Sequence, residues 1–138
     1  MLSEKQIEDI LTKGLIDSRR YNLALNQVYV AGKRIDIVLK TNDNELIAIE
    51  VKIKDWKTAL RQANLNQFAV DKSYVALCSR YAMPAINNIS RFASNGVGLM
   101  IISPDNTFKI VLPPKVTNDS ISNTYKNNLL SSLSLSMA

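Results

Sequence analysis

Hydrophobic residues near the start of the chain recur at helical spacing. The positions concerned are Ile7, Ile10, Leu11 and Leu15. Steps of three and four residues predict a helix over residues 3–16, with Glu8 on it. Ser3 and Gln6 have the spacing of a capping box, in which two side chains satisfy free backbone amides at a helix start.

The pattern then changes to the alternation that is typical of β-strands. Residues 23–40 are rich in β-formers and are punctuated by Gly32, and residues 46–53 alternate again. Between them, residues 41–44 read Thr-Asn-Asp-Asn, which is turn chemistry. The sequence therefore predicts two strands up to Lys40 and a third over residues 46–53, the last two forming a hairpin.

Helix and strand signals alternate in the second half of the chain. The expected elements are a helix capped by Asp55, a strand over residues 73–78, a helix from Pro84 to Asn95-Gly96, and strands over residues 97–102 and 107–112. Trp56, at the start of the first of these helices, is interpreted as a core anchor rather than as a platform for stacking bases. The order helix, three strands, helix, strand, helix, two strands predicts an α/β fold with a central mixed sheet flanked by helices.

The domain organisation follows from length and from a change in composition. A chain of 138 residues fits one domain, which we expect over residues 1–114. Residues 115–138 are rich in Ser and Asn. Two alternatives remain for this tail: a frayed end, or a weak helix that could serve dimerisation. The helical alternative rests on the spacing of Ile121, Tyr125, Leu129 and Leu133.

Composition narrows the chemistry. The sequence has no histidine and a single cysteine, Cys78, which excludes imidazole catalysis, Ser-His-Asp triads and cysteine zinc sites. A formal net charge of +5 favours a polyanionic partner such as DNA. No run approaches the ~18 apolar residues of a membrane span, and the N-terminus lacks a secretion signal, so we expect no membrane partner and a cytoplasmic location.

The predicted hairpin carries the candidate chemistry. A three-residue loop over residues 42–44 sets the register and places Asp36 directly opposite Glu50. Facing carboxylates destabilise a sheet unless a cation lies between them. Lys52 shares their face, because it lies two residues beyond Glu50. A loop of two residues would instead set the carboxylates on opposite faces.

Oxygen ligands without histidine suit a hard divalent ion. Mg²⁺ or Mn²⁺ is therefore expected rather than zinc. Such an ion can polarise a phosphate and lower the pKa of a water molecule, and a neighbouring lysine can stabilise charge or help to remove a proton. We interpret Asp36, Glu50 and Lys52 as the catalytic cluster of a phosphodiesterase.

The segments Arg34-Ile-Asp36-Ile-Val-Leu and Ile49-Glu50-Val51-Lys52 resemble the PD-(D/E)xK nuclease superfamily, with its restriction-endonuclease-like core. The resemblance covers about residues 3–112, but Ile35 stands where the motif has proline. It implies metal binding by Asp36, Glu50 and the Val51 carbonyl, with Lys52 serving the nucleophilic water. It further matches Glu8, with Glu4 as alternate, to a first-helix carboxylate. Gln62 matches a glutamine on the helix after the lysine strand.

The function predicted from these residues is a metal-dependent DNA endonuclease that acts as a homodimer. In its small size the chain resembles stand-alone members of the superfamily such as Holliday-junction resolvases. This resemblance makes branched DNA one expected substrate. The alternative is an inactive nucleic-acid-binding or assembly module that retains the fold. Three cations near the proposed site are expected to contact phosphates: Lys54, Lys57 and Arg61.

Each residue also has a plainer interpretation. The carboxylates and Lys52 could form a solvated hairpin face, although Val38 and Ala48 on the same face argue for burial. Glu8 could be an exposed helix residue, and Gln62 could satisfy a backbone group. The three cations could be a solvated helix flank. A rival motif, Asp55-Trp56-Lys57, is rejected because it opens a helix, where residues two apart do not share a face.

Overall fold

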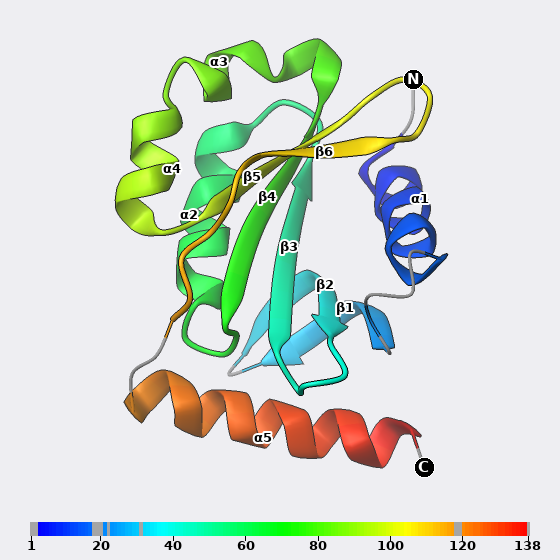
Figure 1. Ribbon diagram of the computed structural model, residues 1–138, viewed down its shortest axis with the longest axis vertical. Coiled ribbons are helices and arrows are strands. Elements are labelled where there is room, and N and C mark those ends of the chain that lie inside the picture. The colour runs from blue at the N-terminus through cyan, green and yellow to red at the C-terminus, as the bar shows by residue number, and fades with distance from the viewer. Residues whose placement is uncertain (1–2, 18–20, 22, 31, 118–119, 138) are drawn as a thin grey trace.

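The computed structural model describes residues 3–17, 21, 23–30, 32–117 and 120–137, and its centre is a six-stranded sheet (Figure 1). The strands are β1 (Leu23–Val30), β2 (Lys33–Lys40), β3 (Leu46–Lys52), β4 (Lys72–Cys78), β5 (Gly98–Ile102) and β6 (Phe108–Leu112). The helices are α1 (Glu4–Asp17), α2 (Trp56–Asn66), the 3-10 turn η1 (Ser79–Tyr81), α3 (Met83–Ile86), α4 (Ile89–Asn95) and α5 (Ser120–Met137). None of these helices is long and apolar enough to cross a membrane, as far as the described residues extend.

The sheet is mixed, as the sequence predicts. Its strands lie in chain order, with β3–β4 and β4–β5 parallel and the other three pairs antiparallel. Parallel neighbours need a crossover, and α2 and the α3–α4 segment supply the two that this sheet requires. The predicted α/β architecture with helices flanking a mixed sheet is therefore confirmed.

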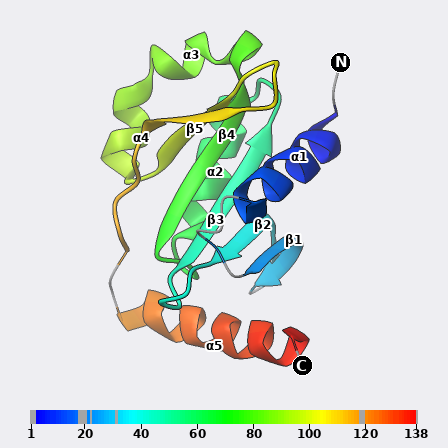
Figure 2. The ribbon, with the colours of Figure 1, turned by 45° about the vertical axis from the view of Figure 1, so that its right-hand side comes forward.

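Helices cover both faces of the sheet (Figure 2). On one face, Ile7, Leu11 and Leu15 of α1 pack into a cluster with Ile37 and Ile49 of the hairpin. On the other, α2 and α4 pack against β4 and β5. The apolar stripe predicted for α1 is thus the face that it buries.

The helix expected from Pro84 to Asn95 is divided in two. Helix α3 ends at Ile86 and α4 begins at Ile89. The Asn88 amide donates to the Pro84 carbonyl over 2.8 Å, a local side-chain bond that competes with a continuous helix. The C-terminal end agrees with the prediction, because Gly96 caps α4 in the left-handed conformation at φ 73°.

The tail contains helix α5 and is therefore helical rather than frayed, while its use in dimerisation stays a prediction. It lies across the end of the sheet at which β3 and β4 begin (Figure 1). Leu129 and Leu133 are buried there, packed with Val38, Ala48 and Val70. The side chain of Ile121, which the helical spacing also included, lies outside the described residues.

The β2–β3 hairpin has the register that a three-residue loop predicts. The Thr41 amide donates to the Glu45 carbonyl over 2.9 Å, and the ladder runs from Lys40–Leu46 to Ile37–Ile49. One further step in this register sets Asp36 opposite Glu50. Asn44 closes the loop in the left-handed conformation, at φ 62°.

The hairpin of β1 and β2 is kinked where Gln27 faces Asp36. Pairs in one register continue on both sides of this point, but Gln27 has φ 56°, a conformation that costs a residue with a Cβ atom roughly 1–3 kcal/mol. A straight strand would point Ile35 and Ile37 to the same face, yet they belong to different hydrophobic clusters. The side chains of β2 therefore change face between Ile35 and Ile37, next to Asp36.

Candidate active site

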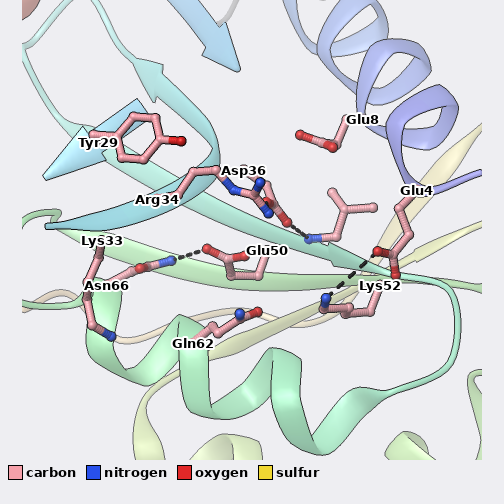
Figure 3. A pocket seen from close by; sticks show the side chains of 11 residues that line it. Glu4, Glu8, Tyr29, Lys33, Arg34, Asp36, Glu50, Lys52, Gln62 and Asn66 are labelled. Atoms are coloured by element: carbon pink, nitrogen blue, oxygen red, sulfur yellow. Dashed lines mark hydrogen bonds and ion pairs between the residues drawn. The ribbon is translucent and has the colours of Figure 1, made fainter. Parts of the chain in front are cut away.

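A cavity of about 360 Å³ opens between α1, the strands β1 to β3 and α2 (Figure 3). It is lined by Glu4, Glu8, Tyr29, Lys33, Arg34, Asp36, Glu50, Val51, Lys52, Gln62 and Asn66. The five residues predicted to be catalytic, which are Asp36, Glu50, Lys52, Glu8 and Gln62, are all in this set. Their functional roles stay predictions, but the fold brings them together from four different elements.

Asp36 and Glu50 form the floor of the cavity. They are 7% and 2% exposed, which contradicts a solvated hairpin face. The Val51 amide donates to Asp36 Oδ2 over 2.9 Å, so the carboxylate caps the end of the β2–β3 ladder. Glu50 Oε1 accepts from the Asn66 side-chain amide over 2.8 Å. Each carboxylate is thus oriented by one neutral donor.

Two adjacent buried carboxylates cannot both carry full charge cheaply. Burial raises the pKa of Glu50 to about 8, and the Asp36 charge acts in the same direction against the bond from Asn66. Without a cation, the pair therefore favours retention of a proton over two full negative charges. The Arg34 guanidinium lies 3.8 Å from Asp36 Oδ1, but its side chain is 54% exposed and only partly offsets this charge.

Both glutamates considered for α1 reach the cavity, at different points. Glu8 is buried and accepts from Gln27 Nε2 over 2.7 Å; burial, followed by the Asp36 charge, raises the pKa of Glu8. Glu4 lies at the other end, with Oε1 at 3.8 Å from Lys52 Nζ and Oε2 accepting the Ile53 amide over 3.2 Å. Glu8 therefore adds a third carboxyl group near Asp36, whereas Glu4 forms an ion pair with Lys52.

Gln62 enters the cavity from α2, below Glu50 and beside Lys52 (Figure 3). Its Oε1 atom is buried and has no hydrogen-bond partner within the part of the chain that the structure describes. The plainer interpretation, that Gln62 satisfies a backbone group, therefore does not account for this oxygen. A buried acceptor without a donor is costly and indicates a ligand or water in the cavity.

Four residues of the cavity were not predicted: Tyr29, Lys33, Arg34 and Asn66. Two of them carried a usable signal. Arg34 stands two positions before Asp36 on a strand, and Asn66 stands four positions after Gln62 on a helix, so both spacings predict a shared face. Tyr29 and Lys33 lie near the turn between β1 and β2, and no local spacing links them to Glu50.

The three cations predicted to contact phosphates do not line the cavity. Lys54 Nζ lies 5.9 Å from the Tyr81 ring centre, and Lys57 Nζ lies 5.7 Å from the Trp56 ring. Arg61 is exposed on α2. Trp56 itself is buried, 5.8 Å from Phe92 between ring centres, so it is the core anchor that the sequence predicts.

The rival motif at Asp55 is confirmed as a helix start. Its carboxylate accepts the Thr58 amide over 3.2 Å and caps α2, and hydrogen bonds from the Thr58 side chain and then from this amide hold the pKa of Asp55 below its ordinary value. The Asp55 side chain is therefore committed to the backbone of its own helix.

The donor set at the cavity floor fits a hard divalent cation. No group of three or more His, Cys, Asp or Glu side chains within the described ranges could hold a metal. A cation here would instead take the two carboxylates, a backbone carbonyl such as that of Val51, and water. The high pKa of Glu50 and the unpartnered oxygen of Gln62 are both features that a hydrated cation would relieve.

Comparisons with known proteins identify the fold and leave the activity open. No family model matches the sequence, and no curated protein is similar enough to match. A protein of unknown function from Silicibacter pomeroyi, SPO1766, is similar in structure with a TM-score of 0.69. The two are 12% identical over 99% of this chain and 89% of that one, which shows a shared fold alone.

Two further solved structures are more distant. SfsA from Pyrococcus furiosus, solved in complex with Ca²⁺, has a TM-score of 0.45 at 9% identity, over 80% of this chain and 62% of its own. A repair endonuclease from Pyrococcus abyssi has a TM-score of 0.48 at 9% identity, over 75% of this chain and 48% of its own. Scores below 0.5 carry no argument about the activity of this chain.

Proposed function

We propose that this chain is a metal-dependent endonuclease that hydrolyses DNA phosphodiester bonds, as its resemblance to the PD-(D/E)xK superfamily implies. The observation that carries the proposal is the buried pair Asp36 and Glu50 on neighbouring strands, open to a cavity that also contains Lys52. A purely structural core has no use for two adjacent carboxylates, since each disfavours the charge of the other. The pair is useful if it binds a cation that in turn contacts the phosphate of a substrate.

The proposed cofactor is Mg²⁺ or Mn²⁺, held by Asp36, Glu50 and the Val51 carbonyl. When bound, such an ion polarises the scissile phosphate and lowers the pKa of the attacking water. Asn66 orients Glu50 for this task through its 2.8 Å bond, and the Val51 amide orients Asp36. Both oriented oxygens belong to rigid strands, which limits reorganisation during the reaction.

Lys52 and Gln62 are proposed to serve the attacking water. The ammonium of Lys52 stabilises negative charge that develops on the phosphate or nucleophile, and Glu4, at 3.8 Å, keeps it near the carboxylates. The buried Oε1 of Gln62 can accept a hydrogen bond from that water and so fix its direction. Glu8, held by Gln27, adds acceptor capacity beside Asp36.

The substrate phosphates are proposed to meet exposed cations around the acidic floor. Arg34 and Lys33 lie at the cavity itself, and Lys54, Lys57 and Arg61 lie along the loop before α2 and on that helix.

One active site of this kind cuts one strand of a DNA duplex. We therefore propose a homodimer for paired cuts, which sedimentation equilibrium tests directly: a monomer at concentrations that cut both strands contradicts it.

The proposal is tested by cleavage of plasmid, linear, single-stranded and four-way-junction DNA with Mg²⁺ and Mn²⁺. Asp36→Asn keeps an acceptor for the Val51 amide but loses the charge, and Lys52→Met keeps the apolar stem. Each is expected to lower the cleavage rate by roughly 100-fold or more. Asp43→Asn in the exposed hairpin turn and Lys109→Met on β6 are the matched controls.

Chelation with EDTA is expected to abolish cleavage by the wild type. The proposal is wrong if the wild type cuts none of these substrates with either ion. Binding without any cleavage would identify the chain as the inactive nucleic-acid-binding module instead.

A further inference from the structure

A second cavity of about 260 Å³ lies beside the candidate active site and differs from it in chemistry. It is lined by Val30, Lys33, Ile35, Leu65, Asn66, Phe68, Ala69 and Tyr125. Two of these residues, Lys33 and Asn66, also line the acidic cavity, so the two spaces adjoin. Most of the remaining residues that line it are apolar, in contrast to the carboxylates of the acidic cavity.

Two aromatic side chains at this cavity are open to solvent. Phe68 is 53% exposed and Tyr125 is 38% exposed. Phe68 follows the end of α2, and Tyr125 lies on α5. Exposed rings that line a cavity, rather than scattered singly over the surface, indicate a binding site.

The ring of Tyr125 is carried by an anchored helix. The neighbouring Lys126 pairs with Asp71 over 2.7 Å, and the second oxygen of Asp71 accepts the Leu46 amide over 2.8 Å. Leu129, one turn further along α5, is buried in the core. These contacts fix α5 against the start of β3, so Tyr125 is held at the cavity in the absence of any ligand.

We propose that this cavity binds one unpaired nucleobase of the substrate, next to the phosphate in the acidic cavity. This inference rests on the proposed nuclease function and adds a substrate class to it. Aromatic faces with apolar walls are the side chains on which bases stack. The ammonium of Lys33, at the boundary of the two cavities, suits the phosphate.

The base must be unpaired, because a base inside a duplex is stacked on both faces and cannot enter a side-chain cavity. The substrate class that fits is therefore DNA with single-stranded nucleotides at the cut, such as a flap, a loop or the opened arm of a branch. The formal net charge of +5 also favours a polyanionic partner for the molecule as a whole over an apolar peptide.

The test uses the Asp36→Asn protein, which is expected to bind DNA without cutting it. Its affinity is measured for a single-stranded oligonucleotide, and for the same oligonucleotide with abasic sites. Phe68→Leu and Tyr125→Leu keep apolar volume but remove a ring face. Each is expected to weaken binding of the intact strand roughly five-fold or more. Met83→Ala, an exposed residue on α3, is the control.

The abasic strand separates base stacking from phosphate contacts. It is expected to bind more weakly than the intact strand. The Phe68→Leu and Tyr125→Leu variants should then bind the abasic strand almost as tightly as their parent does. Thermal unfolding of each variant checks that the fold is retained. A 2-aminopurine base in the strand should lose fluorescence on binding to the parent protein and recover it in the two variants.

The inference is overturned if both variants bind the intact strand as tightly as their parent, or if abasic DNA binds equally well. A dimer that dissociates in these variants while DNA affinity is unchanged would also overturn it, since the cavity would then be a protein interface. Cleavage by the wild type reports separately on the proposed function. An active enzyme with unaffected variants contradicts only the base site.

Discussion

At the scale of single residues, the buried pair of Asp36 and Glu50 destabilises the fold when both carboxylates are charged. Glu50 is 2% exposed and its pKa is raised to about 8 by burial and by the Asp36 charge. The folded state therefore binds a proton that the unfolded chain has lost above its ordinary pKa of 4.5. That proton stabilises the fold fully below pH 4.5, and the stabilisation is lost as pH rises to about 8.

Glu50→Gln is predicted to remove this pH dependence. The metal-free variant should exceed the wild type in free energy of unfolding by a few kcal/mol at pH 9, and by much less at pH 5. Urea unfolding in EDTA measures both values, with Asp43→Asn as control. Mg²⁺ should then stabilise the wild type at pH 9 and leave Glu50→Gln unchanged. Parallel pH profiles for the two proteins would contradict the prediction.

Gln27 is the strained residue of the site. Its left-handed φ of 56° coincides with the 2.7 Å bond to Glu8, which indicates that the conformation is retained for that contact. Gln27→Gly tolerates this φ, so the free energy of unfolding should change by no more than about 1 kcal/mol. Cleavage should nevertheless fall about tenfold, because the hydrogen bond that orients the Glu8 carboxyl group is lost.

The comparison with Gln27→Asn separates backbone from side chain. Asparagine tolerates the left-handed region but is one methylene shorter than glutamine. It should therefore fold well and share the lower cleavage rate, with the loss in kcat rather than in KM if Gln27 positions Glu8. Full activity in both variants would leave Gln27 with a structural role only.

At the scale of elements, α5 is part of the core rather than an appended tail. Leu129 and Leu133 are 5% and 3% exposed. They pack on the face of the β2–β3 hairpin that is opposite to the face covered by α1. The helix is also tied to the sheet by Lys126 and Asp71. Helices α5 and α1 therefore pack on opposite faces of β2 and β3.

Leu129→Ala and Leu133→Ala are each predicted to lower the free energy of unfolding by about 2–4 kcal/mol. Chemical denaturation measures this, and Ser131→Ala on the exposed side of the same helix is the control. Cleavage by the folded fraction should also fall, since the hairpin loses support. A change below about 0.5 kcal/mol in both leucine variants would mean that α5 does not pack on the sheet in solution.

At the scale of the whole molecule, charge is distributed in a way that suits a polyanion. The formal net charge is +5, yet the floor of the cavity is acidic and its rim carries Arg34 and Lys33. Under the proposed function, long-range attraction would bring DNA to the surface, and the buried carboxylates would bind a phosphate only with a cation present.

DNA affinity is predicted to fall linearly with salt on logarithmic axes. Lys57→Ala and Arg61→Ala should each reduce that slope by about one if the side chain contacts a phosphate. Fluorescence anisotropy between low and moderate salt measures the slope, with Lys109→Ala as control. Unchanged slopes would assign Lys57 and Arg61 to the solvated flank of α2, the plainer of the two interpretations.

Much of the fold was predictable because its decisive contacts are local. The capping box of α1 forms as expected, with Ser3 and Gln6 exchanging bonds of 2.8 and 3.1 Å. The hairpin register follows from a loop of three residues, and one further step beyond the pair Ile37–Ile49 sets Asp36 opposite Glu50. The prediction of one helix from Pro84 to Asn95 is wrong, because the Asn88 side chain donates to the Pro84 carbonyl and competes with a continuous helix.

The sequence by itself thus determined the order of elements, the register of the hairpin and the sharing of one face by its ionisable residues. Only the tertiary structure decided which distant groups meet them: Asn66 at Glu50, Glu4 at Lys52, and Tyr125 at the apolar cavity. The reason is physical. Strand period and turn length act over a few residues, whereas these contacts depend on how separate helices pack on the sheet.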